Sequence, residues 1–421
     1  MYKKTVLNNG LRVVTHDVKD RQSVALGIWL GVGGRYEQDR VKGIAHFMEH
    51  IVFKGSRNYS CAKIKESVEG VGGALNAFTS EEQTCYYAKF PFKYTESTFD
   101  VLSDMAFFPR ISPKDIEKEK GVIIEELKMY HDLPQYYVIE LLDELLWPGH
   151  PLGKSLAGTE ESVSSLQKRD LTEFHRIHYN PLNTVVVGCG RISHHKFVGA
   201  VKRKLGLLPQ SQKIQFVQAN TTQNQPRSRF FRKDIEQMHL ALGVLGYDYH
   251  HKDKYIVALL NTILGGNMSS RLFVEVREKR GLAYSISSYC KPMHDTGAFC
   301  VRAGVDNQKI VQAVELIFKE LVKIRRSSVS SGEFIRAKDY LLGQLLLGLE
   351  DTMDHMLWLG EGVIACNEIK TLKGIIAEFE KIKPSDIKRV ANDLFRENRL
   401  NLSIVGPVSD QQEKQLKDLL V

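Results

Sequence analysis

Two histidines and a glutamate lie close together in one short apolar segment of the chain. The segment reads Gly-Ile-Ala-His-Phe-Met-Glu-His-Ile-Val-Phe over positions 43–53, so His46 and His50 are four residues apart with Glu49 between them. On a helix, residues four apart share one face, and both imidazoles could therefore bind one metal ion. Glu49 follows His46 by three residues on that face, where its carboxylate could take a proton from a metal-bound water. The pattern predicts a metal site with a general base beside it.

Two histidines do not complete a catalytic zinc site, which usually has three protein ligands and a water. The order H-x-x-E-H is the inverted zincin motif and favours Zn2+. A predicted helix at 115–130 carries the candidate third ligands, because it combines glutamates with a buried apolar face. Spacing alone leaves Glu119, Glu125 and Glu126 open. Glu119 and Glu126 are seven residues apart and share a face, so one could bind the metal while the other hydrogen-bonds a ligand histidine.

Two interpretations without a metal compete with this one. The histidines could be hydrogen-bonded core residues, and the glutamates of the second helix could form a solvated face. The combination argues against both, because one apolar helix carries the whole motif and a second helix offers paired carboxylates.

The elements that must position these residues occur in two similar series. The first series has strands at 3–8, 11–17, 23–32 and around 74–90, and helices at 42–54, 60–70 and, interrupted by prolines, 93–147. The second has strands near 229–247, helices near 253–279, strands near 283–303 and then helices to the end. Because strands and helices occur in runs, we predict an α+β fold with mixed or antiparallel sheets and helices packed on one face.

The repeated order predicts a division of the chain into two halves related by internal duplication. We predict a catalytic zinc-binding half at 1–208, a polar linker at 209–226 and a second, metal-free half at 227–421. Helices that begin at Asp170 and Asp386 each lead to an apolar strand that ends in a glycine, which supports the duplication.

Composition excludes some classes of protein. The formal net charge is +8, but basic and acidic residues are interleaved and no nucleic-acid motif is present, so we predict no nucleic-acid partner. Six scattered cysteines without a CxxC pair predict reduced thiols, not disulfides or a cysteine-ligated metal. The sequence has no apolar stretch long enough for a membrane span and no visible signal peptide, which predicts a cytoplasmic location.

With these residues in view, the sequence resembles the pitrilysin-like (inverzincin, M16) zinc metallopeptidases. It is most similar to the short-subunit branch that includes mitochondrial processing peptidase and its bacterial relatives, over almost the whole chain. The resemblance implies that the third ligand, about 76 residues after the second histidine, is Glu126 and that Glu119 supports the site. It also implies that an edge strand holds the substrate backbone by β-augmentation. The residues of that strand are Asn76, Ala77, Phe78 and Thr79.

The resemblance assigns two residues of the second half to the same site. Arg277 and Tyr284 match the arginine and tyrosine with which family members reach across to the zinc, where they would stabilise the oxyanion. The helix at 255–261, equivalent to the one with the metal motif, has no histidine. The family further implies that the two halves enclose a chamber, which limits substrates to extended, unfolded peptides, and that the chain forms a homodimer.

One departure concerns the recognition of basic presequences. Processing peptidases carry an acidic pair one helical turn apart, and the matching positions here are Tyr136 and Glu140, with Asp143 and Glu144 nearby. The sequence therefore predicts a zinc metalloendopeptidase, with one Zn2+ per chain, that hydrolyses unfolded peptides or presequence-like segments. The alternative is a non-catalytic structural or assembly subunit of the same fold, against which the complete metal motif argues.

Overall fold

The computed structural model describes residues 2–210, 212 and 214–420, and the chain forms two compact units. One unit comprises Met1–Leu127, Ser155–Val217 and Leu346–Lys370, and the other comprises Lys128–Lys154, Gln218–Leu345 and Thr371–Val421. The segment Lys128–Lys154 of the first series therefore belongs to the second unit, and the segment Leu346–Lys370 of the second series belongs to the first unit. Positions 1, 211, 213 and 421, which fall in the predicted halves and linker, lie outside the described residues. The division into 1–208, 209–226 and 227–421 stays a prediction.

The first unit is built on a six-stranded sheet in the order β1-β2-β6-β3-β5-β4. β2 and β6 are parallel and the other neighbouring strands are antiparallel. Only β4 and β1 lie at the edges. The strands are β1 (Tyr2–Val6), β2 (Arg12–Asp17), β3 (Ser23–Leu30), β4 (Ala74–Thr79), β5 (Thr84–Pro91) and β6 (Thr184–Gly190).

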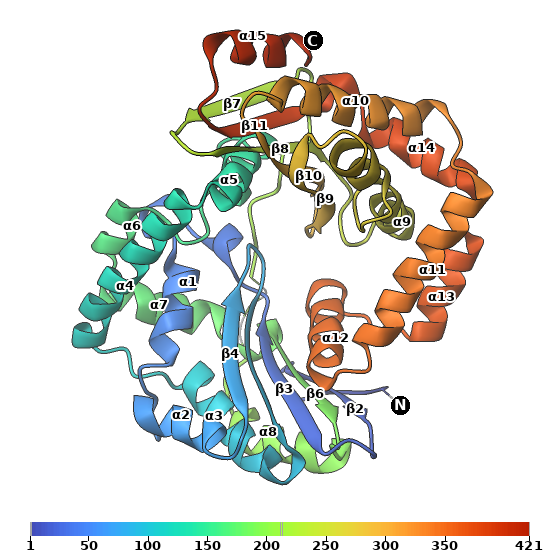
Figure 1. Ribbon diagram of the computed structural model, residues 1–421. Coiled ribbons are helices and arrows are strands. Elements are labelled where there is room, and N and C mark those ends of the chain that lie inside the picture. The colour runs from blue at the N-terminus through green and yellow to red at the C-terminus, as the bar shows by residue number, and fades with distance from the viewer. Residues whose placement is uncertain (1, 211, 213, 421) are drawn as a thin grey trace. The chain divides into compact units, whose positions relative to one another are not determined.

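Helices cover both faces of this sheet. One face packs against the larger helical layer, whose core contains Val13, Leu26 and Phe47. The layer comprises α1 (Ile44–Val52), α2 (Cys61–Glu69), α3 (Thr95–Phe107), α4 (Pro113–Asp132), α6 (Glu160–Ser165), α7 (Lys168–His178) and α8 (His194–Leu205). Among the described residues, the helix on the opposite face is α12 (Thr352–Cys366), which lies beside β3 and β6 (Figure 1). Alternate residues of a strand point to opposite faces, so Val14 belongs to the α12 core while Val13 does not.

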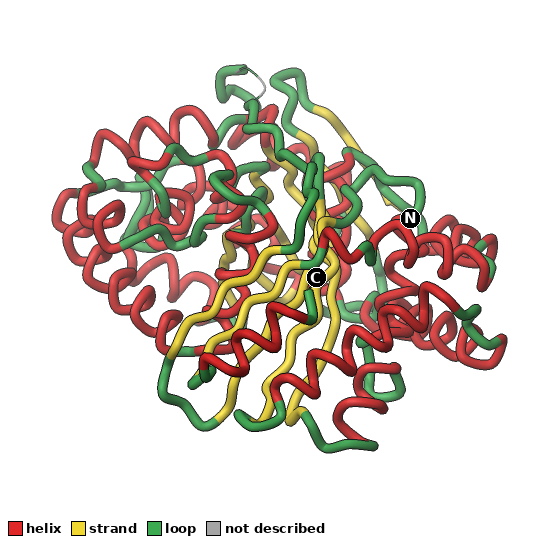
Figure 2. Tube along the Cα trace, turned by 90° about the horizontal axis from the view of Figure 1, so that it is seen from above, coloured by secondary structure: helices red, strands yellow, loops and turns green. Residues whose placement is uncertain are grey.

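The second unit repeats this construction on a five-stranded sheet in the order β7-β11-β8-β10-β9. Its one parallel pair, β7 with β11, matches β2 with β6, and its antiparallel pairs follow in the same order. Figure 2 shows strands lying side by side with helices over them. The strands are β7 (Arg227–Arg232), β8 (Gln237–Leu245), β9 (Ala283–Pro292), β10 (Gly297–Asp306) and β11 (Asn401–Gly406).

In the part of the chain that the structure describes, one helix again packs on one face of this sheet. α5 (Pro134–Leu146) contacts β8 and β11, and the larger layer lies on the other face. That layer includes α9 (Lys254–Leu264), α10 (Ile310–Arg326), α14 (Pro384–Leu394) and α15 (Asp410–Asp418); α11 (Ser331–Gly348) and α13 (Leu372–Lys381) complete the helices. The predicted α+β class with two similar halves is confirmed, with one addition, the lone helix on the second face of each sheet. The predicted chamber stays a prediction.

Local sequence signals explain several element ends. Ser60 caps α2 by accepting a hydrogen bond from the Lys63 backbone, as its position predicts. Gly10 has a φ of 90° in the β1–β2 turn, a left-handed conformation that favours glycine. Among the described residues, no helix has both the length and the apolar character needed to cross a membrane.

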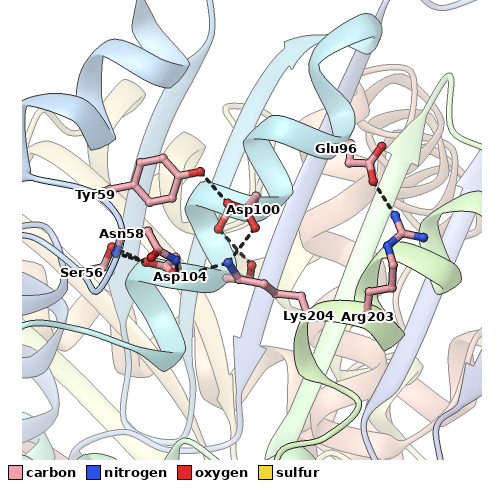
Figure 3. Close-up of polar contacts among 9 residues, drawn as sticks. Ser56, Asn58, Tyr59, Glu96, Asp100, Asp104, Arg203 and Lys204 are labelled. Carbon is pink, nitrogen blue, oxygen red and sulfur yellow. Dashed lines mark hydrogen bonds and ion pairs between the residues drawn. The ribbon is translucent and has the colours of Figure 1, made fainter.

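A polar network fixes the loop that leaves α1. The buried Asp104 carboxylate accepts hydrogen bonds from the Ser56 hydroxyl and from the backbone and side chain of Asn58, and Lys204 of α8 reaches it at 3.1 Å (Figure 3). Burial by itself raises the pKa of Asp104, but these bonds and the Lys204 charge outweigh it and hold the pKa below its ordinary value of 3.8. The network thus anchors the end of α1 to α3 and α8.

The Asp104→Asn variant should lower the free energy of unfolding by about 1.5–3 kcal/mol, because charge-assisted hydrogen bonds are lost in a buried site. Since the folded-state pKa is depressed, this stabilisation is fully present above about pH 4 and disappears as the pH falls through the folded-state pKa. Urea unfolding of both chains between pH 7 and pH 3 measures it. Glu96→Gln, which breaks a surface ion pair with Arg203, is the control and should cost less than about 1 kcal/mol. An equal cost for both variants at pH 7 would contradict the role given to Asp104.

Candidate metal centre

The helix α1 begins at a glycine for a steric reason. Gly43 has a φ of 93°, and a Cβ at this position would lie 2.4 Å from the Ala157 carbonyl oxygen. The buried Glu37 supplies hydrogen-bond acceptors to the start of α1. Its carboxylate accepts hydrogen bonds from the backbone N–H groups of Gly43 and Ala45 at 3.0 and 2.7 Å. These contacts determine the residue at which α1 begins. The position of the first turn in turn determines which face of the helix packs against the core.

The apolar residues of α1 pack into the core of the first unit, so the polar residues of the motif lie on the other face of the helix. Ile44, Phe47, Met48, Ile51 and Val52 are buried, with exposed fractions of at most 1%. The three polar residues of the motif are only partly buried. The packing of the apolar positions thus turns the motif toward α4.

The helix α4 supplies two carboxylates to the motif. The Glu126 carboxylate lies 3.8 Å from His46 Nε2 and 3.5 Å from His50 Nε2. One ligand atom from each of these three side chains lies within 4.8 Å of the others, an arrangement that could hold a metal ion. Ligands around a tetrahedral zinc with Zn–N bonds of about 2.0–2.1 Å are roughly 3.4 Å apart, close to these distances.

The second carboxylate orients one histidine. Glu119 is 1% exposed, and its Oε2 accepts from His50 Nδ1 at 3.2 Å while its Oε1 pairs with Lys54 Nζ at 2.6 Å. Because Nδ1 donates its proton to Glu119, Nε2, which faces Glu126, is the ring nitrogen that could bind a metal ion. Sequence spacing could not distinguish Glu119 from Glu126, but the structure does. Glu126 faces His50 Nε2 and Glu119 faces His50 Nδ1. Glu125, the third candidate, is exposed.

The electrostatics of the two histidines favour a cation between them. Burial and the neighbouring His50 lower the pKa of His46 to about 4, so its imidazole is neutral at pH 7. Burial also lowers the pKa of His50, but hydrogen bonds to Glu126 and Glu119 outweigh it and raise the pKa above its ordinary value. The carboxylates therefore stabilise positive charge at His50, which a divalent cation would supply. The donor set of two imidazole nitrogens and one carboxylate fits zinc.

The proposed general base is held by a neighbouring strand. Thr79, the last residue of β4, donates its hydroxyl hydrogen to Glu49 Oε2 at 2.6 Å. Burial raises the pKa of Glu49, and the bond from Thr79 partly opposes that shift. Glu49 thus has a fixed orientation and a carboxylate more basic than one in water.

Removing the Thr79 hydroxyl should weaken catalysis without releasing metal. In Thr79→Val the shape is kept and a hydrogen bond to a charged group is lost, worth about 1.5–3 kcal/mol, so kcat should fall by roughly 10- to 100-fold. Thr79→Ser keeps the donor and should restore most of the activity. Zinc content and peptide-hydrolysis rates of the three chains measure this. Equal kcat values for Thr79→Val and the wild type would show that the contact does not matter.

The predicted substrate strand lies at a free edge of the first sheet. Asn76, Ala77 and Phe78 belong to β4, which pairs with β5 and with no other strand of the described residues. The Asn76 side chain accepts a hydrogen bond from the Ala77 backbone N–H at 2.8 Å. An edge strand with outward-facing backbone groups can accept an extended peptide as a further strand.

Arg277 and Tyr284 belong to the second unit and lie near each other there. Arg277 is in a π-helical turn, η6 (Phe273–Glu278), and its guanidinium is 4.7 Å from the Phe273 ring centroid and 5.9 Å from that of Tyr284. The Tyr284 side chain is 73% exposed. Their role at the metal site stays a prediction.

Sequence reasoning missed two residues that support α1. Lys54 follows His50 by four residues, so helical spacing could have placed it on the face of the motif. Glu37 caps the helix across a turn, six residues before Gly43, and no local pattern indicates such a contact.

Comparisons with known proteins identify the family of this chain. The family model described as insulinase (peptidase family M16) matches residues 12–160, and the model described as peptidase M16 inactive domain matches 165–341. The uncharacterized zinc protease YmxG of Bacillus subtilis is 35% identical over 97% of this chain and 98% of its own length.

Two solved structures share the fold. A protease from Helicobacter pylori superimposes with a TM-score of 0.92 at 24% identity, covering 96% of this chain and 99% of that one. A chain of the complex III dimer from Candida albicans reaches 0.85 at 19% identity, covering 99% of each chain.

The fold has two similar α+β halves, and the relative from Bacillus subtilis that matches almost the whole chain is named a zinc protease. The chain belongs to peptidase family M16.

Proposed function

We propose that this chain is a zinc-dependent endopeptidase that hydrolyses unfolded peptides or presequence-like segments. The observation that carries the proposal is the convergence of His46, His50 and Glu126, whose ligand atoms lie within 4.8 Å of one another next to Glu49. These three side chains would hold one Zn2+. A zinc ion bound there would polarise the scissile carbonyl and lower the pKa of a bound water.

The residues of the chain would do the rest of the chemistry. Glu49 takes a proton from the attacking water and delivers it to the leaving amine, while Thr79 keeps the carboxylate oriented. Residues 76–79 hold the substrate extended along the edge of β4, and this backbone pairing tolerates many sequences. Arg277 and Tyr284 would stabilise the oxyanion, an assignment that rests on the family resemblance.

The assembly and location are part of the same proposal. The proposal includes a homodimer, which the family resemblance implies, and a cytoplasmic location, and it includes no nucleic-acid partner. A structural subunit is the alternative, since a chain of complex III shares this fold. The presence of all three ligands and the base favours the enzyme.

Removal of the metal tests the enzyme against the structural subunit. Chelation should abolish hydrolysis of a mixed library of unfolded peptides, and added Zn2+ should restore it while Mg2+ should not, because imidazole and carboxylate together suit zinc. Mass spectrometry of the products measures cleavage, and the thermal midpoint confirms that the chain stays folded. A folded, zinc-loaded chain that cleaves nothing in the library would favour the structural subunit.

A further inference from the structure

A second group of metal-ligand side chains lies within the first unit, under α12. His16 is in β2 and Cys189 is in β6, and the two residues are directly opposite each other in the parallel ladder. Cys189 belongs to the core on the α12 face of the sheet, whereas α1 packs on the other face. His355, in the first turn of α12, completes the group. The three residues come from segments more than 160 positions apart and lie on the opposite side of the sheet from the H-x-x-E-H motif.

The distances are close to those of a metal site. Cys189 Sγ lies 3.8 Å from His16 Nδ1, and the rings of His16 and His355 are 4.3 Å apart between centroids. One ligand atom from each residue lies within 4.8 Å of the others. Around a tetrahedral zinc with bonds of about 2.3 Å to sulfur and 2.0–2.1 Å to nitrogen, these separations would be roughly 3.4–3.6 Å. Side-chain rotations that close about 1 Å would therefore bring all three atoms to one ion.

A hydrogen bond sets His355 in the tautomer that a ligand needs. Its Nδ1 is 3.1 Å from the carbonyl oxygen of Leu349, which can only accept, so Nδ1 carries the proton. The lone pair is therefore on Nε2, where the Tyr2 hydroxyl donates to it at 3.0 Å. A backbone carbonyl that orients a histidine in this way is a common feature of protein metal sites.

Burial keeps all three candidate ligands uncharged in the absence of metal. It lowers the pKa of His16 to about 4, with His355 as the second cause, and it also lowers the pKa of His355. Both imidazoles are therefore neutral at pH 7 and keep a lone pair. Burial raises the pKa of the Cys189 thiol to about 12, so a metal ion would have to displace its proton.

We propose that His16, Cys189 and His355 form a second, structural zinc site. On binding, the Cys189 S–H bond breaks, a Zn–S bond forms and the proton passes to the solvent, while two imidazole nitrogens complete three protein ligands. The fourth position takes water beside the Tyr2 hydroxyl. The ion would be bound by residues of β2, β6 and α12, and it would thereby stabilise the packing of the segment 346–370 on the first sheet. One thiolate with two imidazoles selects zinc over calcium or magnesium.

Cobalt spectroscopy of the whole chain tests this site separately from the proposed catalytic one. The ligands His46, His50 and Glu126 contain no sulfur, so a thiolate-to-cobalt charge-transfer band in the near ultraviolet reports only a cysteine ligand. The metal-free chain titrated with Co2+ should develop this band together with a second equivalent of bound metal. Cys189→Ser should lose the band and one equivalent. Cys85→Ser is the matched control, because Cys85 is buried in the same core without histidine ligands and should keep both.

Two results of the cobalt titrations would overturn the proposal, and the first needs only the wild-type chain. A folded chain that binds cobalt without any thiolate band, or a band that Cys189→Ser leaves intact, would mean that the group is a hydrogen-bonded cluster without metal. Neither result would bear on the H-x-x-E-H site, whose test is hydrolysis after zinc is restored. A zinc titration of the wild type followed by metal analysis gives a further check, with two equivalents expected and one contradicting the second site.

Discussion

Replacing Glu49 with glutamine is expected to reduce peptide hydrolysis by about 100- to 10,000-fold while the chain keeps its zinc. Glutamine has nearly the same shape and can still contact Thr79, but it cannot take a proton from water. The effect should appear in kcat, because the ligands of the metal and the edge strand β4 are unchanged. Rates with a fluorogenic peptide and zinc content by metal analysis are the two measurements.

The control for this variant is Glu69→Gln, which changes an exposed glutamate at the end of α2 and should leave both quantities unchanged. Hydrolysis by Glu49→Gln at the wild-type rate, with equal zinc, would remove Glu49 as the base. Loss of zinc together with activity would instead mean that Glu49 helps to hold the metal.

The second large effect is expected on zinc binding and activity when glutamates of α4 are replaced. We compare variants of Glu119, Glu125 and Glu126. Glu126→Gln should lose zinc and activity together, because its carboxylate faces Nε2 of both histidines. Glu119→Gln should weaken zinc binding by about 10- to 100-fold and keep activity at saturating zinc, since it removes only the partner of His50 Nδ1. Glu125→Gln is the control.

Zinc dissociation constants measured by competition with a chelator, and rates at saturating zinc, separate the three variants. The predicted order of zinc affinity is Glu125→Gln equal to the wild type, then Glu119→Gln, then Glu126→Gln. If Glu126→Gln binds zinc as tightly as the control, the third ligand has been assigned to the wrong glutamate.

The local parts of the site were predictable from the sequence because helical geometry fixes them. The four-residue spacing of His46 and His50 places them on one face of any helix, and the apolar residues between them predict which face is buried. The third ligand was not predictable in this way. Glu119 and Glu126 share a face of α4, so only the tertiary position of that helix decides which one meets Nε2.

The fold was predictable where short-range signals act and not where distant segments meet. The β1–β2 hairpin and α2 follow from a glycine turn and a serine cap. The helices predicted near 253–279 are α9 and the π-helical turn η6, separated by a loop that begins with Gly265 and Gly266 after the end of α9 at Leu264. The packing of α12 on the first sheet and of α5 on the second is set by long-range contacts that no local pattern encodes. For the same reason the grouping of His16, Cys189 and His355 left no sequence signal.

Anomalous diffraction at the zinc absorption edge, from crystals of the zinc-loaded chain, would show whether His46, His50 and Glu126 hold the metal. We expect a peak within about 2.0–2.2 Å of His46 Nε2, His50 Nε2 and a Glu126 oxygen, with a water at the fourth position beside Glu49. A zinc-loaded crystal without a peak between these three side chains would contradict it.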